Sequence, residues 1–313
     1  MQIATQILIA ILLDILAGDP RWLPHPVRMM GRFAAAAERL WRRVVPSEYL
    51  AGLLTVAALL GATGCTIFGL LRFAGWLHPL AGTAVSIYFL YAGIAARDLV
   101  EHSRAVHRAL AGGDLETGRR RVGFLVARET AHLDEAAVAR AAVESVAENL
   151  VDGITAPLFY GILGGPVAMM LYKAASTMDS MFGYKNATYR RFGWAAARLD
   201  DLANFLPARL TGLLIPLAAS LTGLRGRDSW RILRRDRRRH ASPNAGHPEA
   251  AVAGALGVQL GGPSVYFGAV IPKPTLGDHR RPLAAADIRA ANRLVLATAL
   301  LFTGLLLPIR MLL

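Results

Sequence analysis

Apolar residues along this chain gather into runs that carry almost no charge, and charged stretches separate these runs. Residues 50–71 form the clearest run, because none of them carries a charge. A helix of this length, at about 1.5 Å rise per residue, reaches roughly 33 Å and crosses the hydrocarbon core of a bilayer. A second uncharged run covers residues 73–96. The two runs predict a helical hairpin with Arg72 at its tip.

Two further runs predict spans near the ends of the chain. Residues 3–17 are apolar apart from a few polar side chains, among them Asp14, and they lack the basic leader and cleavage site of a secretory signal. We therefore expect a retained first span. Residues 294–313 form the last apolar run, which only Pro308 and Arg310 interrupt near its end.

The remaining apolar segments are interrupted by proline and glycine. Residues 154–171 and 205–224 each contain two prolines with glycines nearby, a pattern typical of broken or re-entrant helices that line a cavity. The polar residues 97–153 and 225–249 are predicted to be cytoplasmic helical insertions. Within the first insertion, Gly112-Gly113-Asp114 is a turn signal that divides two expected helices.

Together the pattern predicts an all-α, polytopic integral membrane protein with broken or re-entrant helices, in a single domain over residues 1–313. Composition agrees with this class, because 54% of the 313 residues are hydrophobic and the mean hydropathy is +0.38. The one cysteine, Cys65, excludes an intramolecular disulfide and a cluster of thiolate metal ligands.

Net charge refines the topology rather than the fold. The formal charge of +13 comes almost entirely from arginine. Because these arginines flank apolar runs, the positive-inside rule accounts for them without nucleic-acid binding. Their distribution predicts an outward N-terminus, with residues 97–153 and 225–240 in the cytoplasm. Residues 172–204 are also expected in the cytoplasm if the broken segments on either side of them are re-entrant.

Three acidic residues before the first broken segment are the first candidate for chemistry. Glu144, Glu148 and Asp152 recur at intervals of four residues and would share one face of a helix. No Lys or Arg lies between them in the sequence to relieve their repulsion, so a bound Mg²⁺ is a reasonable remedy. The alternative is a solvated helix face.

The polar stretch between the broken segments is the second candidate. Asp201 and Asn204 lie about one helical turn apart, a spacing that suits a divalent ion. Lysine and arginine side chains around them could take phosphate oxygens. The alternative is interfacial anchoring with a helix cap. The residues that we select from this stretch are Lys173, Asp179, Lys185, Arg198, Asp200, Asp201, Asn204 and Arg209.

Two histidine-containing loops complete the candidates. Residues 240–249 place His240, Ser242 and Asn244 in one turn-rich loop. Near the N-terminus, His25 is either a base or a capping histidine at the interface. The sequence contains no Gly-Lys-Ser or Gly-Lys-Thr phosphate loop, no dinucleotide fingerprint and no Gly-x-Ser-x-Gly motif. No standard nucleotide-binding or hydrolase fold is therefore indicated.

These stretches, taken together, resemble the membrane-bound adenosylcobinamide-phosphate synthase family of cobalamin biosynthesis over nearly the whole chain. One residue departs from the expected pattern: Glu129 stands where the family is expected to have Asp, which keeps the charge. The matching motifs are Gly18-Asp19-Pro20, His25-Pro26-Val27, Val143-Glu144-Ser145-Val146-Ala147-Glu148-Asn149, Asp152-Gly153, Thr177-Met178-Asp179-Ser180-Met181, Arg198-Leu199-Asp200-Asp201 and Ser242-Pro243-Asn244-Ala245-Gly246.

The resemblance implies an ATP- and Mg²⁺-dependent enzyme that joins adenosylcobyric acid, through a propionate carboxylate of the corrin, to aminopropanol or its phosphate. ATP would first convert the carboxylate to an acyl phosphate, which the amine then attacks. His25 or His240 would handle a proton. The implied metal ligands and general base come from Glu144, Glu148, Asp152, Asp179, Asp200 and Asp201, with Asn204 as a further ligand. The implied phosphate and cosubstrate contacts are Lys173, Lys185, Arg198, Arg209, Ser242 and Asn244.

Two other functions stay open from the sequence. The first is a Mg²⁺-dependent membrane transferase that acts on a lipid phosphate or prenyl diphosphate. The second is a transporter, although the chain shows no pair of related halves. The expected partners are the corrinoid, the amine and membrane lipid, in the cell inner membrane, with the active site facing the cytoplasm. A homo-oligomer, or a complex with other late cobalamin-assembly membrane enzymes, also stays open.

Overall fold

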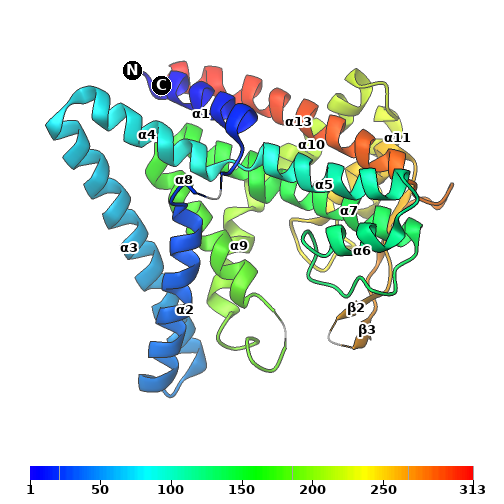
Figure 1. The fold of residues 1–313 in the computed structure, drawn as a ribbon, viewed down its shortest axis with the longest axis horizontal. Coiled ribbons are helices and arrows are strands. Elements are labelled where there is room, and N and C mark those ends of the chain that lie inside the picture. Colours follow the sequence, from blue (N-terminus) through cyan, green and yellow to red (C-terminus); the bar gives the residue numbers. More distant parts are fainter. Residues whose placement is uncertain (21, 185, 267, 313) are drawn as a thin grey trace. The chain divides into compact units, whose positions relative to one another are not determined.

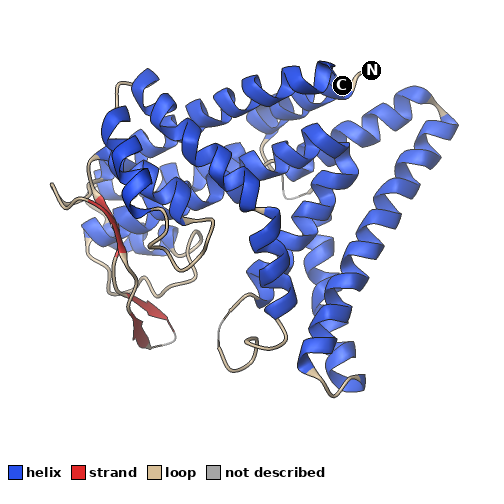
Figure 2. Cartoon of the chain, turned by 180° about the vertical axis from the view of Figure 1, so that it is seen from behind, coloured by secondary structure: helices blue, strands red, loops and turns tan. Residues whose placement is uncertain are grey.

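The chain is helical throughout most of its length and contains little strand (Figure 2). A computed structural model describes residues 1–20, 22–184, 186–266 and 268–312. The chain divides into two compact units. Unit 1 comprises Met1–Ala95, Ala156–Asn204 and Leu306–Leu313, and unit 2 comprises Ala96–Thr155 and Phe205–Leu305. The sequence predicted one domain, and no motif marks where the chain passes from one unit to the other.

Unit 1 is built around α3, which packs against α2, α4, α8 and α9. The antiparallel course of α2 and α3 is visible in Figure 1. Large apolar side chains of α3, such as Phe68 and Trp76, are exposed, as expected for a helix that faces lipid. The helices of this unit are α1 (Ile3–Ala17), α2 (Pro26–Val44), α3 (Glu48–Leu77), α4 (Pro79–Gly93), α8 (Ala156–Phe182) and α9 (Trp194–Ala203).

Unit 2 surrounds α12 (Gly246–Leu256), which packs against α7, α10, α11, β1 and β4. Within α12 every residue is buried except His247, because Ala and Gly allow neighbouring elements to approach closely. The other helices are α5 (Ala96–Ala111), α6 (Leu115–Val122), α7 (Glu135–Leu150), α10 (Phe205–Leu221), α11 (Gly226–Asp236) and most of α13 (Ala285–Leu312).

Two short antiparallel strand pairs follow α12 in unit 2. β1 (Gln259–Gly261) pairs with β4 (Thr275–Gly277), and Leu260 lies opposite Leu276. β2 (Ser264–Tyr266) pairs with β3 (Ala269–Ile271). The first pair contacts α12, so the strands return the chain to the buried helix.

The predicted all-α, polytopic class is confirmed. Within the described residues, four helical stretches are long and apolar enough to cross a membrane, and α9 with α10 would make a fifth if counted as one bent span. Helix α1 has the predicted bounds but contains only 15 residues. The four stretches are Glu48–Leu77, Pro79–Ala111, Glu135–Phe182 and Ala285–Arg310.

The predicted hairpin tip at Arg72 is wrong. Helix α3 continues through Arg72 to Leu77, and the chain turns at His78-Pro79. A residue before proline is disfavoured in helical conformation, and His78 is extended, with φ −165° and ψ 137°. Its Nδ1 accepts the Leu80 N–H at 3.2 Å. The proline therefore indicated the position of the turn better than the single arginine did.

The first polar insertion contains three helices instead of the predicted two. The turn at Gly112-Gly113-Asp114 is confirmed, but it leads into the short helix α6, whose Thr117 N–H is capped by the Asp114 carboxylate at 2.9 Å. Helix α7 begins only at Glu135, after the N-cap Asp134. Helix α6 was not predicted, because its arginine-rich sequence has no long apolar stripe.

The first broken segment is interrupted in two ways. A π-helical turn over Val151–Thr155 joins α7 to α8. Farther along, Gly165 adopts φ 67° directly before Pro166, which places a kink inside α8. Proline lacks an N–H for the helical ladder, and glycine tolerates the left-handed region. The predicted break by Pro166 is therefore confirmed, although the segment belongs to a longer helical stretch.

Candidate active site

A buried carboxyl group lies at the centre of unit 2. Glu249 lies in the first turn of α12 and is only 5% exposed. His240, in the loop that precedes this helix, places its Nε2 3.8 Å from a Glu249 oxygen. The Ser242 N–H donates to His240 Nδ1 at 3.0 Å. In the neutral imidazole, this bond assigns the proton to Nε2, which faces Glu249.

The surroundings of Glu249 oppose its ionisation. Burial raises the pKa of the Glu249 carboxyl well above its usual value, and the negative charges of Glu148 and Glu144 raise it further, although Lys273 and Arg128 act in the opposite direction. Burial also lowers the pKa of His240. A carboxyl group with a raised pKa is a stronger base than an ordinary glutamate, which suits proton transfer near neutral pH.

Two of the charged residues around Glu249, Arg128 and Glu144, form an ion pair with each other. Arg128 Nη2 lies 2.6 Å from a Glu144 oxygen, and Arg128 Nη1 donates to Ser264 Oγ at 3.0 Å. The other Glu144 oxygen accepts the Gly261 N–H at 2.6 Å. Arg128 therefore supplies the positive charge for Glu144. This ion pair was not predicted, because Arg128 lies in the loop before α7 and is sixteen residues from Glu144 in the sequence.

The three acids before α8 do not lie on one continuous α-helical face. Glu144 and Glu148 are on α7, but Asp152 lies in the π-helical turn. A π-helical turn has a different angular spacing from an α-helix, so the four-residue interval does not carry the face on to Asp152. Glu148 is exposed and contributes charge to the surroundings of Glu249.

The predicted loop residues order the chain around His240. Ser242 Oγ accepts the N–H groups of Asn244 and Ala245 at 3.3 and 3.2 Å. Asn244 Oδ1 accepts from Arg209 Nη1 at 3.3 Å. Gly246 is required because a Cβ there would lie 2.4 Å from the Arg237 carbonyl oxygen. The Ser-Pro-Asn-Ala-Gly stretch therefore fixes the start of α12.

Unit 1 contains the second candidate group. Asn204 ends α9 and is 2% exposed, and its Nδ2 donates to Asp200 Oδ2 at 3.0 Å. The Tyr172 hydroxyl donates to Asn204 Oδ1 at 2.9 Å, and the ring of Tyr172 stacks on Tyr160 with centroids 5.2 Å apart. Asn204 is thus held by side chains from α8 and α9.

Other predicted residues of unit 1 lie on the same two helices. Asp179, on α8, interacts electrostatically with Asp201 of α9. Arg198 lies 3.9 Å from Asp201 but is largely exposed. Lys173 lies on α8, six residues before Asp179. Lys185 falls outside the described residues.

His25 does not cap the helix that it precedes. It occupies the N-cap position of α2, yet its side chain forms no capping hydrogen bond. Its Nε2 instead lies 3.5 Å from Asp19 Oδ2. Tyr91 and Tyr88 of α4 donate hydrogen bonds to the Gly18 and Pro24 carbonyl oxygens. The tyrosines thereby hold the loop that presents His25 and Asp19.

No group of three or more His, Cys, Asp or Glu side chains suited to a metal ion occurs in the part of the chain that the structure describes. Mg²⁺ that arrives with a nucleotide needs only one or two protein carboxylates, because phosphates and water complete its shell. The Asp179 and Asp201 pair fits that mode. The predicted metal ligands divide between the units: Glu144, Glu148 and Asp152 belong to unit 2, and Asp200, Asp201 and Asn204 belong to unit 1.

Glu249 was predicted only as one of the potential ligands in the loop 240–249, and no role was predicted for Arg128 or Lys273. Glu249 carried a detectable signal, since it is one acid ahead of an apolar, alanine-rich run. No sequence pattern marked Arg128 or Lys273, because both lie in loops and the chain contains many other Arg and Lys residues. Their importance depends on tertiary contacts with Glu144 and Glu249.

Comparisons with known proteins agree with these motifs. The family profile described as "CobD/Cbib protein" matches residues 7–295. "Cobalamin biosynthesis protein CobD" of Geobacter metallireducens is 52% identical over 92% of this chain and 91% of its own length. The protein of the same name from Leptospira interrogans is 46% identical over 94% of each chain. "Cobalamin biosynthesis protein CbiB" of Salmonella typhimurium is 44% identical over 96% of each.

No solved structure matches the chain significantly, so the family rests on sequence. The match covers both units and every motif on which the resemblance was based. The chain belongs to the CobD/CbiB family of cobalamin biosynthesis proteins.

Proposed function

We propose that this chain is a membrane-bound amide synthase that joins the propionate carboxylate of adenosylcobyric acid to aminopropanol or its phosphate, with ATP and Mg²⁺. The observation that carries the proposal is the family membership over nearly the whole chain. The buried acid and histidine pair of unit 2 supports it, because amide formation requires removal of a proton from the amine.

The proposed reaction has two steps. An oxygen of the corrin carboxylate attacks the γ-phosphorus of ATP, the bond to ADP breaks, and an acyl phosphate forms. The amine nitrogen then attacks the acyl carbon, and inorganic phosphate leaves. The amine gives up a proton in this second step, and we assign Glu249 as the base that accepts it. His240 acts as the positioning residue, since its Nε2 faces the Glu249 carboxylate.

Charge around the phosphates completes the proposal. When bound, Mg²⁺ neutralises phosphate oxygens and so stabilises the transferred charge. Asp179 and Asp201 would hold it. Arg209 would contact phosphate oxygens, and Lys173 and Arg198 would do so in unit 1. We place the protein in the cell inner membrane with this chemistry on the cytoplasmic side, following the distribution of arginine.

A reconstituted assay tests the proposal. The purified full chain in lipid nanodiscs is given adenosylcobyric acid, MgATP, and either aminopropanol or its phosphate, and products are identified by mass spectrometry. We expect adenosylcobinamide or its phosphate, with one ADP released per amide formed. Product without ATP consumption, or no product with either amine, contradicts the proposal. Transfer to a prenyl or lipid phosphate in parallel reactions would favour the transferase alternative instead.

A further inference from the structure

Three arginines of unit 2 gather beside the loop that precedes α12. Arg209, on α10, lies over the Phe205 ring at 3.4 Å and donates to the Phe205 carbonyl oxygen at 2.6 Å. It also donates to Asn244 Oδ1. These contacts hold a half-buried guanidinium group in one orientation. An anion that binds there does not have to order this side chain, so less conformational entropy is lost on binding.

Backbone packing brings the other two arginines to the same place. Arg237 follows the end of α11, and its carbonyl oxygen lies where a Cβ on Gly246 would stand. Gly212 of α10 similarly leaves room for His247, whose Cβ would be 3.1 Å from a Cβ at position 212. Arg237 and Arg238 both interact electrostatically with Arg209 and with His247.

The positive charges at this place are not compensated by the protein. Among the described residues, no Asp or Glu forms an ion pair with Arg209, Arg237 or Arg238. Burial and the three arginines lower the pKa of His247 to about 4, so its imidazole is neutral at physiological pH. Like charges held together without an acid are stabilised when an anion binds between them.

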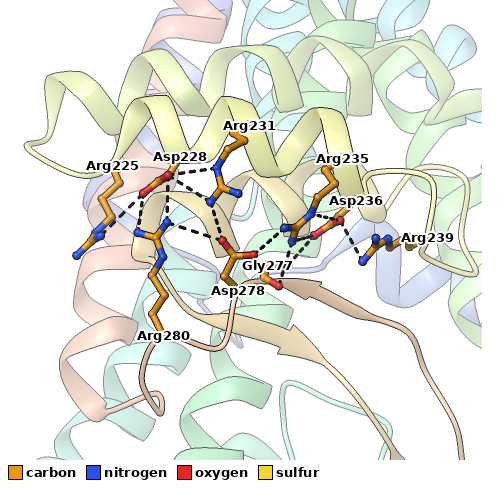
Figure 3. A network of polar contacts seen from close by, with 9 residues as sticks. All are labelled: Arg225, Asp228, Arg231, Arg235, Asp236, Arg239, Gly277, Asp278 and Arg280. Atoms are coloured by element: carbon orange, nitrogen blue, oxygen red, sulfur yellow. Dashed lines mark hydrogen bonds and ion pairs between the residues drawn. The ribbon is translucent and has the colours of Figure 1, made fainter.

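Other arginines on α11 and just after it show the contrast. Arg231 and Arg235 each contact Asp278, and Arg235 and Arg239 contact Asp236 (Figure 3). Each of these cations has a carboxylate partner within the protein. Arg209, Arg237 and Arg238 differ from them, because none of the three has an acidic partner among the described residues.

We propose that Arg209, Arg237 and Arg238 form a binding site for a phosphate group, with Asn244 and His247 beside it. A phosphate monoester or polyphosphate is favoured because Arg209, which hydrogen bonds hold in place, interacts electrostatically with Arg237 and Arg238, and none of the three has an acidic partner within the described ranges. That the ligand is the nucleotide or the phosphorylated amine rests on the proposed function. The binding of phosphate itself does not.

Direct binding measurements test this proposal. The full chain in phosphatidylcholine nanodiscs is titrated calorimetrically with ATP, aminopropanol phosphate, inorganic phosphate and detergent-free phosphatidylglycerol vesicles. We expect Arg237→Gln/Arg238→Gln to weaken at least one of these by about tenfold or more, as the loss of charged hydrogen bonds predicts. The probe that is affected identifies the source of the phosphate.

A matched control separates a site from bulk charge. Arg227→Gln/Arg234→Gln removes two exposed arginines from α11, the helix directly before Arg237, and should leave every binding constant within about twofold, as expected for exposed charges. Arg237→Lys/Arg238→Lys should retain part of the affinity, which shows that the fold persists. Equal weakening by both glutamine pairs, or by neither, overturns the proposal. Because the readout is binding, this result is independent of whether amide synthesis is observed.

Discussion

Unit 2 contains two networks of arginine and carboxylate groups with opposite balances. The network between α11 and the segment after β4 joins three aspartates to five arginines (Figure 3), and most of these arginines are exposed. The cluster around Glu249 joins Glu144 and Glu148 to Arg128 and Lys273, with the central carboxyl group buried. The first network has five arginines for three aspartates, and the second has three glutamates for two cations.

The pKa shifts follow this difference. In the α11 network, hydrogen bonds from arginines lower the pKa values of Asp228 and Asp278. In the cluster, burial and neighbouring glutamates raise the pKa of Glu249. A fully paired network holds the loop at Asp278 against α11. A buried carboxyl group with a raised pKa is suited to the proton transfer that we propose for Glu249.

The largest expected effect on stability comes from breaking the buried ion pair. Arg128→Met leaves Glu144 charged without its partner, so we expect a loss of about 3–5 kcal/mol in the free energy of unfolding. Thermal and denaturant unfolding in detergent micelles would measure it. Adding Glu144→Gln should recover much of the loss, because the amide oxygen still accepts the Gly261 N–H. If the double variant is as unstable as the single one, the pair is not the cause.

A smaller loss is expected at the buried end of the α11 network. Asp236 is fully buried and accepts the Gly277 N–H at 2.9 Å as well as two bonds from Arg235. Asp236→Ala leaves the Gly277 N–H without an acceptor, which should cost about 1–3 kcal/mol. Unfolding experiments would measure this, while the rate of amide synthesis at a temperature below unfolding should stay near that of the unmodified chain. A large loss of rate with an intact fold would contradict the structural assignment.

The two networks should respond to pH in opposite directions. Because the folded-state pKa of Asp278 is lowered, its stabilising contribution is present above its unfolded pKa of about 4 and is lost as pH falls below it. The pKa of Glu249 is raised, so its contribution is present below about pH 4 and is lost as pH rises through its folded pKa. Melting temperatures would be measured against pH for the unmodified chain and for both variants. Asp278→Asn should lose the rise in stability with pH, and Glu249→Gln should lose the fall. Identical pH profiles for the unmodified chain and the two variants would refute the comparison.

The smallest effect is expected at the exposed part of the α11 network. Asp278→Asn removes contacts with Arg231 and Arg235, whose side chains are 47% and 38% exposed. Exposed ion pairs contribute about 0–1 kcal/mol each, so the change in unfolding free energy should be near 1 kcal/mol and should shrink in high salt. Salt-dependent unfolding curves would test this, and a loss that grows with salt would contradict it.

The sequence predicted the helical membrane class because long uncharged runs have few other interpretations. The bounds of α1 and the break at Pro166 within α8 were predicted correctly, because run length and proline act locally. The sequence misplaced the turn at Arg72 because helical continuity in an apolar run outweighs one cation, and it missed α6 because that helix is too polar to show a periodic pattern.

Candidate residues were predicted where a motif placed several polar groups close in sequence. Ser242 and Asn244 illustrate this, because their contacts lie within one loop and the adjacent helix. The surroundings of Glu249 could not be predicted, because Arg128 and Lys273 lie more than twenty residues from it in the sequence and meet it through tertiary packing. The π-helical turn at Asp152 could not be predicted either, because the four-residue spacing was interpreted with the geometry of an α-helix.

The rate of amide synthesis by Glu249→Gln tests the central claim most directly. The substitution keeps the size of the side chain and removes the proton acceptor, so the rate should fall about 100-fold or more, as expected for loss of a general base. Glu129→Gln, which alters an exposed glutamate on the loop near β2, should keep nearly the full rate. A folded Glu249→Gln protein that forms the amide as fast as the Glu129→Gln control would contradict the account.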